Sequence, residues 1–181
     1  AYNPQQVALI CERLAPHNAL ATEIAYTAGL RAHELLTLQP RSERTPDPRP
    51  ALPTKFEGRE DGSRYVVTGK GGLIREVQLP SHLAARLEAQ RLATPRPVTD
   101  RHVYYQQHYA IGGGQPWSMA VSRAAKAALG WSTGAHGLRH AYAQERVTEL
   151  QTLEHSQKVA NETVSQELGH FRPEITTTYL R

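Results

Sequence analysis

The sequence predicts a mainly helical protein with one small antiparallel β-sheet, which is an α+β fold. Apolar residues recur at helical spacing through most of the 181 residues. Two short runs between residues 63 and 79 are instead rich in β-branched residues, and a glycine-rich turn separates them. We expect residues 1–181 to form one domain, because this length suits a single core of ordinary size.

The first helices are predicted from their ends. Asn3 and Pro4 supply an N-cap and a proline at the first helical position. Pro16 ends this helix, and a second helix continues to Gly29, a residue type that commonly ends helices. Residues 30–38 are predicted to form a short third helix.

A proline-rich loop is expected next, at residues 39–62, where five prolines are mixed with charged residues. This composition predicts an extended, partly mobile segment rather than a regular element. Residues 64–68 and 75–79 then form a β-hairpin, and the turn between them carries Lys70 at its tip.

The second half of the chain is predicted to be helical. A helix begins at Ser81 and is closed by Pro95 and Pro97. Residues 101–109, with three tyrosines and two histidines, are also predicted to be helical. Further helices are expected over residues 118–129, 134–150 and 156–168, and a last one near Pro173.

The composition is that of a globular protein, with 39% hydrophobic and 21% charged residues. No apolar run approaches the roughly 20 residues of a membrane helix. The net charge of +4 permits a polyanionic partner without requiring one. The single cysteine, Cys11, fits a reducing compartment.

Two arginines are candidates for binding a phosphate. Arg31 and Arg139 each lie at the edge of a predicted core helix, and guanidinium groups make planar, bidentate hydrogen bonds to phosphoryl oxygens. Glu34 lies three residues after Arg31 and would share a helix face with it. Taken singly, each arginine is better explained as a surface or ion-paired residue.

Three further residues could transfer protons or act as a nucleophile. Lys70 on a glycine-rich turn could be solvated, or it could be a mobile general acid. His136, near a helix N-terminus, would be held neutral and could act as a base. Tyr179 could simply pack against the protein. As a nucleophile its phenol, with a pKa of about 10, needs a base and nearby cations.

Metal and nucleotide sites are not favoured. His136 and His140 have the spacing of a helical zinc pair, but position 137 is Gly where such motifs have Glu, and no third ligand is evident. The turn around Lys70 lacks the first glycine and the Ser or Thr of a P-loop. No carboxylate cluster suits a two-metal nuclease. We therefore expect no cofactor.

Six residues in this order resemble the catalytic set of the tyrosine recombinases, the phage integrase family. The resemblance covers about residues 20–179, and its strongest parts are His136-Gly-Leu-Arg-His140 and Leu168-Gly-His170 followed by a tyrosine. It implies the fold of that family's catalytic domain. The six residues are Arg31, Lys70, His136, Arg139, His170 and Tyr179.

The resemblance implies a role for each residue. Tyr179 attacks a DNA phosphodiester, forms a 3′-phosphotyrosyl bond and frees a 5′-hydroxyl, without metal or ATP. Lys70 is the general acid, and His136 assists proton transfer at the tyrosine. The remaining members bind or support the phosphoryl group: Arg31, Arg139 and His170 bind it, while Glu34 and His140 support the site.

The resemblance also implies partners. They are double-stranded DNA carrying a recombination site, and further copies of the protein in a synaptic complex, a tetramer on DNA. We expect a cytoplasmic, nucleoid-associated protein of a prokaryote, phage or other mobile genetic element. The chain is expected to be a catalytic domain from a longer protein, without its N-terminal DNA-binding domain.

Three departures from the family pattern stand out. The loop at residues 39–62 is longer than usual, residues 146–166 lack a glycine turn, and only two residues follow Tyr179. A type IB topoisomerase uses a similar residue set, although Leu-Gly-His and the short tail favour a recombinase. A DNA-binding module that no longer cleaves is a second alternative. A third alternative, a helical protein–protein adaptor, would explain the helices but not the order of the motifs.

Overall fold

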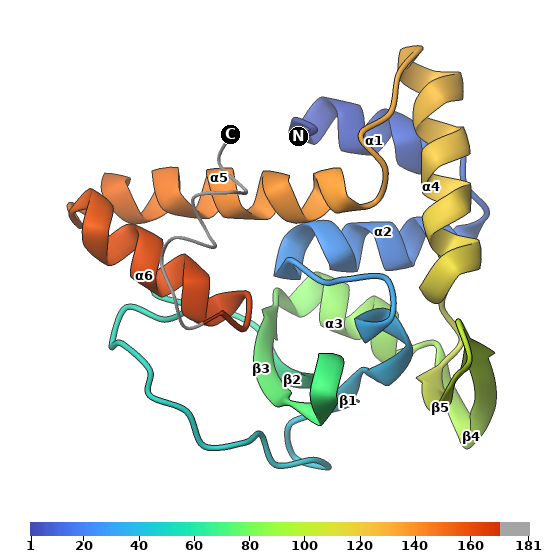
Figure 1. Ribbon diagram of the computed structural model, residues 1–181, viewed down its shortest axis with the longest axis horizontal. Helices are drawn as coiled ribbons and strands as arrows, with labels where there is room; N and C mark the ends of the chain where they lie inside the picture. Colours follow the sequence, from blue (N-terminus) through green and yellow to red (C-terminus); the bar gives the residue numbers. More distant parts are fainter. Residues whose placement is uncertain (171–181) are drawn as a thin grey trace.

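Two long helices form the centre of the molecule (Figure 1). The computed structural model describes residues 1–170, so the predicted helix near Pro173 and the nucleophile candidate Tyr179 lie outside the described residues. Helix α2 (Pro16–Ala28) packs along α5 (His136–Thr152). At one end of this pair lie α1 (Pro4–Glu12) and α4 (Gly114–Leu129), and at the other end α6 (Gln157–Glu167) packs on α5.

The predicted N-terminal cap is confirmed. The side chain of Asn3 accepts a hydrogen bond from the backbone N–H of Gln6 at 2.8 Å, and the side chain of Gln6 accepts one from the N–H of Asn3. This reciprocal capping box satisfies two N–H groups that the first turn of a helix leaves without partners. Gly29 ends α2 in the left-handed conformation that its sequence position predicts.

The predicted hairpin is confirmed as part of a three-stranded antiparallel sheet. Its order is β1 (Gln39–Pro40), β2 (Ser63–Thr68) and β3 (Ile74–Leu79), and helix α3 (Ser81–Glu88) follows. A short 3₁₀ turn, η2 (Lys70–Gly72), joins β2 to β3.

Residues 101–109 are not helical, and Pro95 and Pro97 do not close a helix. Both prolines lie in strand β4 (Arg91–Asp100), which pairs with β5 (Val103–Tyr109) in a separate two-stranded sheet. Each strand of such a sheet has an unpaired edge, so a proline can lie there without removing a ladder hydrogen bond. The run of aromatic residues in β5 has strand propensity, which outweighs the helical spacing.

The third predicted helix is also wrong in extent. Only η1 (Glu34–Thr37) is helical between residues 30 and 38, and it is a 3₁₀ turn. The side chain of Glu34 accepts the backbone N–H of Arg31 at 2.8 Å, which satisfies this donor outside any helix. The chain must also turn from α2 to β1 within ten residues, which leaves no room for a full helix.

The proline-rich segment has no helix or strand between residues 41 and 62, as predicted, but it is anchored to the protein. Phe56 is buried, the hydroxyls of Thr54 and Thr163 are 2.6 Å apart, and the N–H of Leu52 donates to Gln166. These contacts fix the second half of the loop against α6, so the predicted mobility does not apply there.

A buried ion pair fixes the end of α6. Arg146 and Glu167 have no exposed surface, and two hydrogen bonds of 3.0 Å join the guanidinium to the carboxylate. The hydroxyl of Tyr142 and the N–H of Phe56 donate to the same carboxylate at 2.6 and 2.7 Å. The turn between α5 and α6 has no glycine, and Glu154 adopts the left-handed conformation there instead (φ 71°).

The apolar core has two parts among residues 1–170. The larger cluster joins α1, α2 and α4 to the three-stranded sheet and α3, and the smaller one lies between α5 and α6. Within the same range no helix is long and apolar enough to cross a membrane.

We predict that Arg146→Ala destabilises the protein by about 3–5 kcal/mol, because it leaves the Glu167 carboxylate buried without its charge partner. Urea unfolding measures the loss. The matched control is Arg86→Ala, which removes a half-exposed arginine paired with Glu23 and is expected to cost less than about 1 kcal/mol. Equal losses in the two variants would contradict the role of the buried pair.

Candidate active site

A cleft of about 940 Å³ brings several predicted site residues together. Its wall is formed by the segment before η1, the tip of the β2–β3 hairpin, the β4–β5 hairpin and the start of α5. Four of the six predicted residues line it: Arg31, Lys70, His136 and Arg139. These residues come from three segments that are far apart in the sequence.

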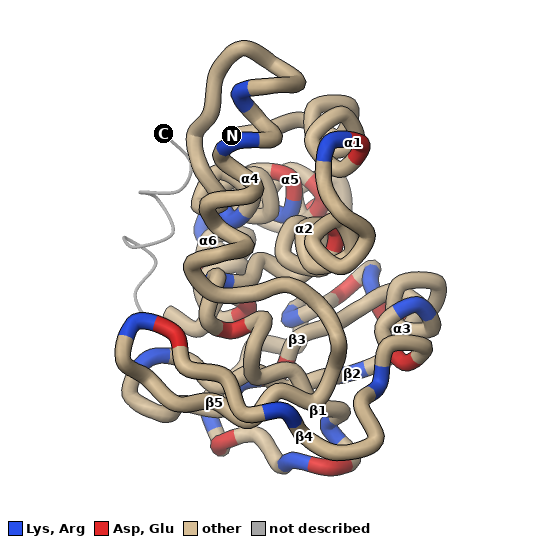
Figure 2. Tube along the Cα trace, turned by 90° about the vertical axis from the view of Figure 1, so that its right-hand side faces the viewer, with Lys and Arg blue, Asp and Glu red and all other residues tan. Residues whose placement is uncertain are grey.

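The cleft is basic. Among residues 1–170, five of its lining residues are cationic: Arg31, Arg44, Lys70, Arg101 and Arg139. In the same range Asp100 is the one acidic lining residue, and its carboxylate accepts a hydrogen bond from the backbone N–H of Gln115 at the start of α4. Figure 2 shows cationic and acidic positions interspersed along the trace. The described lining of the cleft therefore carries an excess of positive charge.

The carboxylate of Glu34 lies beneath the cleft with no exposed surface. It is paired with Arg75, and its oxygens lie 3.8 Å from Arg31 Nη1 and 4.0 Å from Arg139 Nη1. Burial alone would raise the pKa of Glu34, but Arg75 and Arg139 outweigh it and lower the pKa to about 2. One carboxylate that is ionised at neutral pH therefore lies close to both of the predicted phosphate-binding arginines.

Arg139 has a fixed orientation. Its guanidinium donates to the backbone carbonyls of Gly29 and Leu168, the latter at 2.7 Å, and Nη2 lies 3.4 Å from Nε2 of His170. A side chain at position 29 would meet Leu168 and Tyr142 at less than 3 Å, and the backbone there is left-handed. Glycine is therefore required at position 29, whose backbone carbonyl accepts the hydrogen bond from Arg139.

The Leu168-Gly169-His170 motif lies directly beside Arg75 and Arg139. Gly169 has φ 86°, and a Cβ there would lie 2.9 Å from the side chain of Arg75, so the motif's glycine is needed for close packing. Burial, Arg139 and Arg31 lower the pKa of His170 to about 4. His170 is therefore neutral at pH 7, and a neutral imidazole has one ring nitrogen that can accept a hydrogen bond and one that can donate.

His136 is the first residue of α5, so it lies near a helix N-terminus as predicted, although the helix begins two residues later than position 134. Burial, Arg139 and Arg31 lower its pKa below the ordinary value, which favours a neutral imidazole. The ring of His140 packs edge-on against it, with centroids 5.2 Å apart. Among the described residues that line the cleft, His136 is included and His140 is not.

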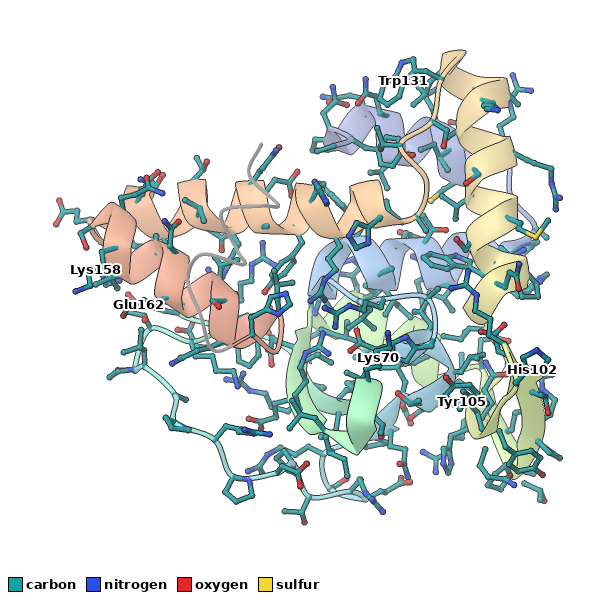
Figure 3. The ribbon with its side chains drawn as sticks, viewed as in Figure 1. Lys70, His102, Tyr105, Trp131, Lys158 and Glu162 are labelled. Carbon is teal, nitrogen blue, oxygen red and sulfur yellow. The ribbon has the colours of Figure 1, made fainter. Side chains whose placement is uncertain are left out.

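The loop before His136 is held by the N-terminal segment. The hydroxyl of Tyr2 donates to the carbonyl of Gly134 at 2.9 Å, and its ring stacks on Trp131, which Figure 3 shows at the far end of α4. This contact fixes the start of α5 and therefore the position of His136.

Lys70 lies at the tip of the β2–β3 hairpin, where Figure 3 shows it in the middle of the molecule, beside the β4–β5 hairpin. It is exposed, and the two glycines that follow have positive φ and open space around them. The lysine can therefore change position without displacing packed side chains.

The sequence reasoning missed Arg75. It lies on β3, opposite Val67, is 6% exposed, and pairs with Glu34 while its Nε donates to the carbonyl of Glu167. It therefore joins the hairpin of Lys70 to the segment of His170. No local signal distinguishes it, because β3 also contains Glu76 and Gln78, so a charged residue in this strand does not by itself indicate burial.

Among residues 1–170, no three His, Cys, Asp or Glu side chains are grouped closely enough to hold a metal ion. His136 and His140 form a ring contact instead.

Comparison with known proteins gives matches in structure and none in sequence. No model of a protein family and no characterised protein sequence matches the chain. The XerH site-specific recombinase, in a post-cleavage complex with a palindromic difH substrate, superposes with a TM-score of 0.59. The chain has the fold of the tyrosine recombinase catalytic domain.

The other tyrosine recombinases agree. A lambda integrase dimer bound to a COC′ core site gives a TM-score of 0.54 at 18% identity, and the Tn1549 transposon integrase in complex with a circular intermediate DNA gives 0.55 at 14%. XerH is 18% identical. At least 98% of the chain is covered in each case, but it spans only 48%, 45% and 60% of XerH, lambda integrase and the Tn1549 integrase.

We predict that Glu34→Gln lowers the stability at pH 7 by about 3–5 kcal/mol, because Arg75 is then buried without its counter-charge. The pH dependence also changes. The folded protein holds the Glu34 pKa at about 2, below the ordinary 4.5, so the stabilisation is present above pH 4.5 and lost as the pH falls towards 2. The Glu34→Gln variant has no carboxylate at this position, so its free energy of unfolding should fall less between pH 4.5 and pH 2 than that of the wild type.

Urea unfolding at a series of pH values between 7 and 2 measures both effects. Glu12→Gln, at an exposed position on α1, is the matched control and should stay within about 0.5 kcal/mol of the wild type at pH 7. A Glu34→Gln profile parallel to that of the wild type throughout would show that this carboxylate is not the buried anion of the site.

Proposed function

We propose that the chain is the catalytic domain of a tyrosine-type site-specific recombinase, which cuts and rejoins DNA strands through a 3′-phosphotyrosyl intermediate. The observation that carries the proposal is a basic cleft on this fold, lined by Arg31, Lys70, His136 and Arg139. Nine residues after His170 the sequence has Tyr179, the required nucleophile.

The proposed cleavage step is a transfer of one phosphoryl group. The phenolic oxygen of Tyr179 forms a bond to phosphorus while the bond from phosphorus to the 5′-oxygen breaks. His136, held neutral, accepts the phenolic proton, and Lys70 donates a proton to the leaving oxygen. Rejoining is the reverse reaction with another 5′-hydroxyl. Because the covalent bond stores the energy of the phosphodiester, the step needs no ATP, and no metal takes part.

Arg31 and Arg139 bind the non-bridging oxygens and stabilise the additional charge of the transition state. Support comes from their approach to the same carboxylate, Glu34, which holds both guanidinium groups at one side of the cleft. His170 adds a hydrogen bond beside Arg139, and His140 supports His136 through ring contact.

Two alternatives use the same fold or the same residues. A type IB topoisomerase would cut and rejoin one strand without exchanging partners. A DNA-binding module would bind without cutting. The match to three recombinases favours the first proposal, and the retention of all six residues in the sequence argues against the non-cleaving module.

The proposed partner is duplex DNA carrying a recombination site. XerH and lambda integrase were solved bound to DNA, and lambda integrase as a dimer. We extend this to a synaptic complex of four copies, in which a mobile element, phage or chromosome exchanges strands. The cationic lining of the cleft supports the DNA partner, because phosphate contacts dominate such affinities.

Covalent trapping tests the proposal. The wild type and Tyr179→Phe are incubated with nicked duplexes of randomised sequence, and adducts that resist denaturant are counted and sequenced. The wild type should form an adduct, and Tyr179→Phe, which lacks the attacking oxygen, should form none. Wild-type protein that binds the duplexes but yields no adduct would indicate the non-cleaving module.

The general acid is tested in the same assay. Lys70→Ala should slow cleavage by about 10²–10⁴-fold, because the leaving 5′-oxygen loses its proton donor. A 5′-bridging sulfur should restore most of the rate, since a thiolate leaves without protonation. Arg31→Lys is the matched control and should stay slow on both substrates, because its role concerns the non-bridging oxygens. Lys70→Ala that remains slow on the sulfur substrate would exclude Lys70 as the acid.

A further inference from the structure

The β4–β5 hairpin borders the cleft but has no part in the proposed chemistry. Residues 103–106 and His108 of β5 line the cleft. Because four of them are consecutive, the outer edge of the strand, rather than one of its faces, forms this wall. Figure 3 shows Tyr105 on the side of the hairpin nearer Lys70 and His102 on its outer side.

The turn of this hairpin has an unusual composition. Asp100 pairs with Val103, so Arg101 and His102 form a two-residue loop, and their φ angles are 48° and 68°. Positive φ at both positions is the geometry of a type I′ turn, in which Asn-Gly is strongly preferred. Two long side chains are held in a backbone conformation that disfavours them, and such outliers often mark functional positions.

The surface beside the turn is exposed and aromatic. Tyr104 is 64% exposed and Val103 50%, both at the edge of the cleft. Large side chains that remain exposed to water contribute little to the stability of the fold. They are available for contact with a partner that occupies the cleft.

The charge of the hairpin suits an anionic partner. Asp100 is the one acidic residue between positions 91 and 109, and its carboxylate is buried against the start of α4. Arg91 is paired with Glu43 and Arg96 donates a hydrogen bond to Gln107, so Arg101 is the cation at the turn of the hairpin. The exposed tip is therefore cationic.

We propose that the β4–β5 hairpin is a second DNA-binding element, which holds the duplex next to the phosphate bound in the cleft. This inference rests on the proposed function. Arg101 contacts the phosphate backbone, and Tyr104 contacts the sugars and base edges beside it. A two-stranded ribbon has the width to enter the major groove of B-DNA. The long side chains of the turn are retained because they bind DNA.

Fluorescence anisotropy with a labelled random-sequence duplex tests the inference. Arg101→Asn/His102→Gly replaces the turn by the sequence that type I′ turns prefer, so the hairpin should fold at least as well. It is expected to weaken binding about tenfold and to reduce the slope of log K against log salt by about 1 for the lost phosphate contact. Tyr104→Thr keeps strand propensity and should weaken binding with the salt slope unchanged, because no charge is lost.

Lys158→Gln is the matched control for lost charge. Lys158 is exposed on α6, at the opposite end of the molecule from the hairpin (Figure 3), and its replacement should change the affinity less than about twofold. Hairpin variants that bind like the wild type and the control would overturn the inference and leave the proposed function standing. Normal DNA binding combined with lost self-association in sedimentation would also overturn it, in favour of a contact between copies. Wild-type protein without salt-sensitive DNA binding would overturn both proposals.

Discussion

The site depends on one anion that has no contact with water, the carboxylate of Glu34. A buried charge is tolerated only with close counter-charges, so the chain must bring arginines to it from other elements. Arg75 comes from β3 and Arg139 from α5, while Arg31 approaches from the segment before η1. The electrostatic requirement of one carboxylate thereby fixes the relative positions of the sheet, the central helix and the cleft wall.

The C-terminal part of the described chain is fixed by a second set of buried polar contacts. The side-chain carboxylate of Glu167 accepts hydrogen bonds from Arg146 and Tyr142. The backbone carbonyl of Glu167 accepts one from Arg75, and the backbone carbonyl of Leu168 accepts one from Arg139. These contacts fix the end of α6, and His170, three residues later, therefore has a defined position beside Arg139. In the proposed mechanism, this is the segment that leads to Tyr179.

The sequence was most informative where structure is local. The cap at Asn3, the left-handed end of α2 at Gly29 and the glycine turn that carries Lys70 follow from the preferences of individual residues. The sequence wrongly predicts a helix over residues 101–109, where the structure has the turn and strand β5, because the turn at Arg101 and His102 uses neither Asn nor Gly and the aromatic residues fit either element.

The site was predictable only in part. The order of the motifs identified Arg31, Lys70, His136 and Arg139, which the fold brings to one cleft. The contribution of Arg75 was not predictable, because its partner lies 41 residues away and nothing local distinguishes a buried arginine from an exposed one. Glu34 was predicted as a support, but its complete burial depends on packing that only the structure shows.

The most direct test of this account is a crystal structure of the Tyr179→Phe variant bound to duplex DNA. The account predicts one phosphodiester in the cleft, with both Arg31 and Arg139 within hydrogen-bond distance of its non-bridging oxygens and Glu34 still paired with Arg75. A duplex bound elsewhere on the surface, with no phosphate near these two arginines, would contradict it.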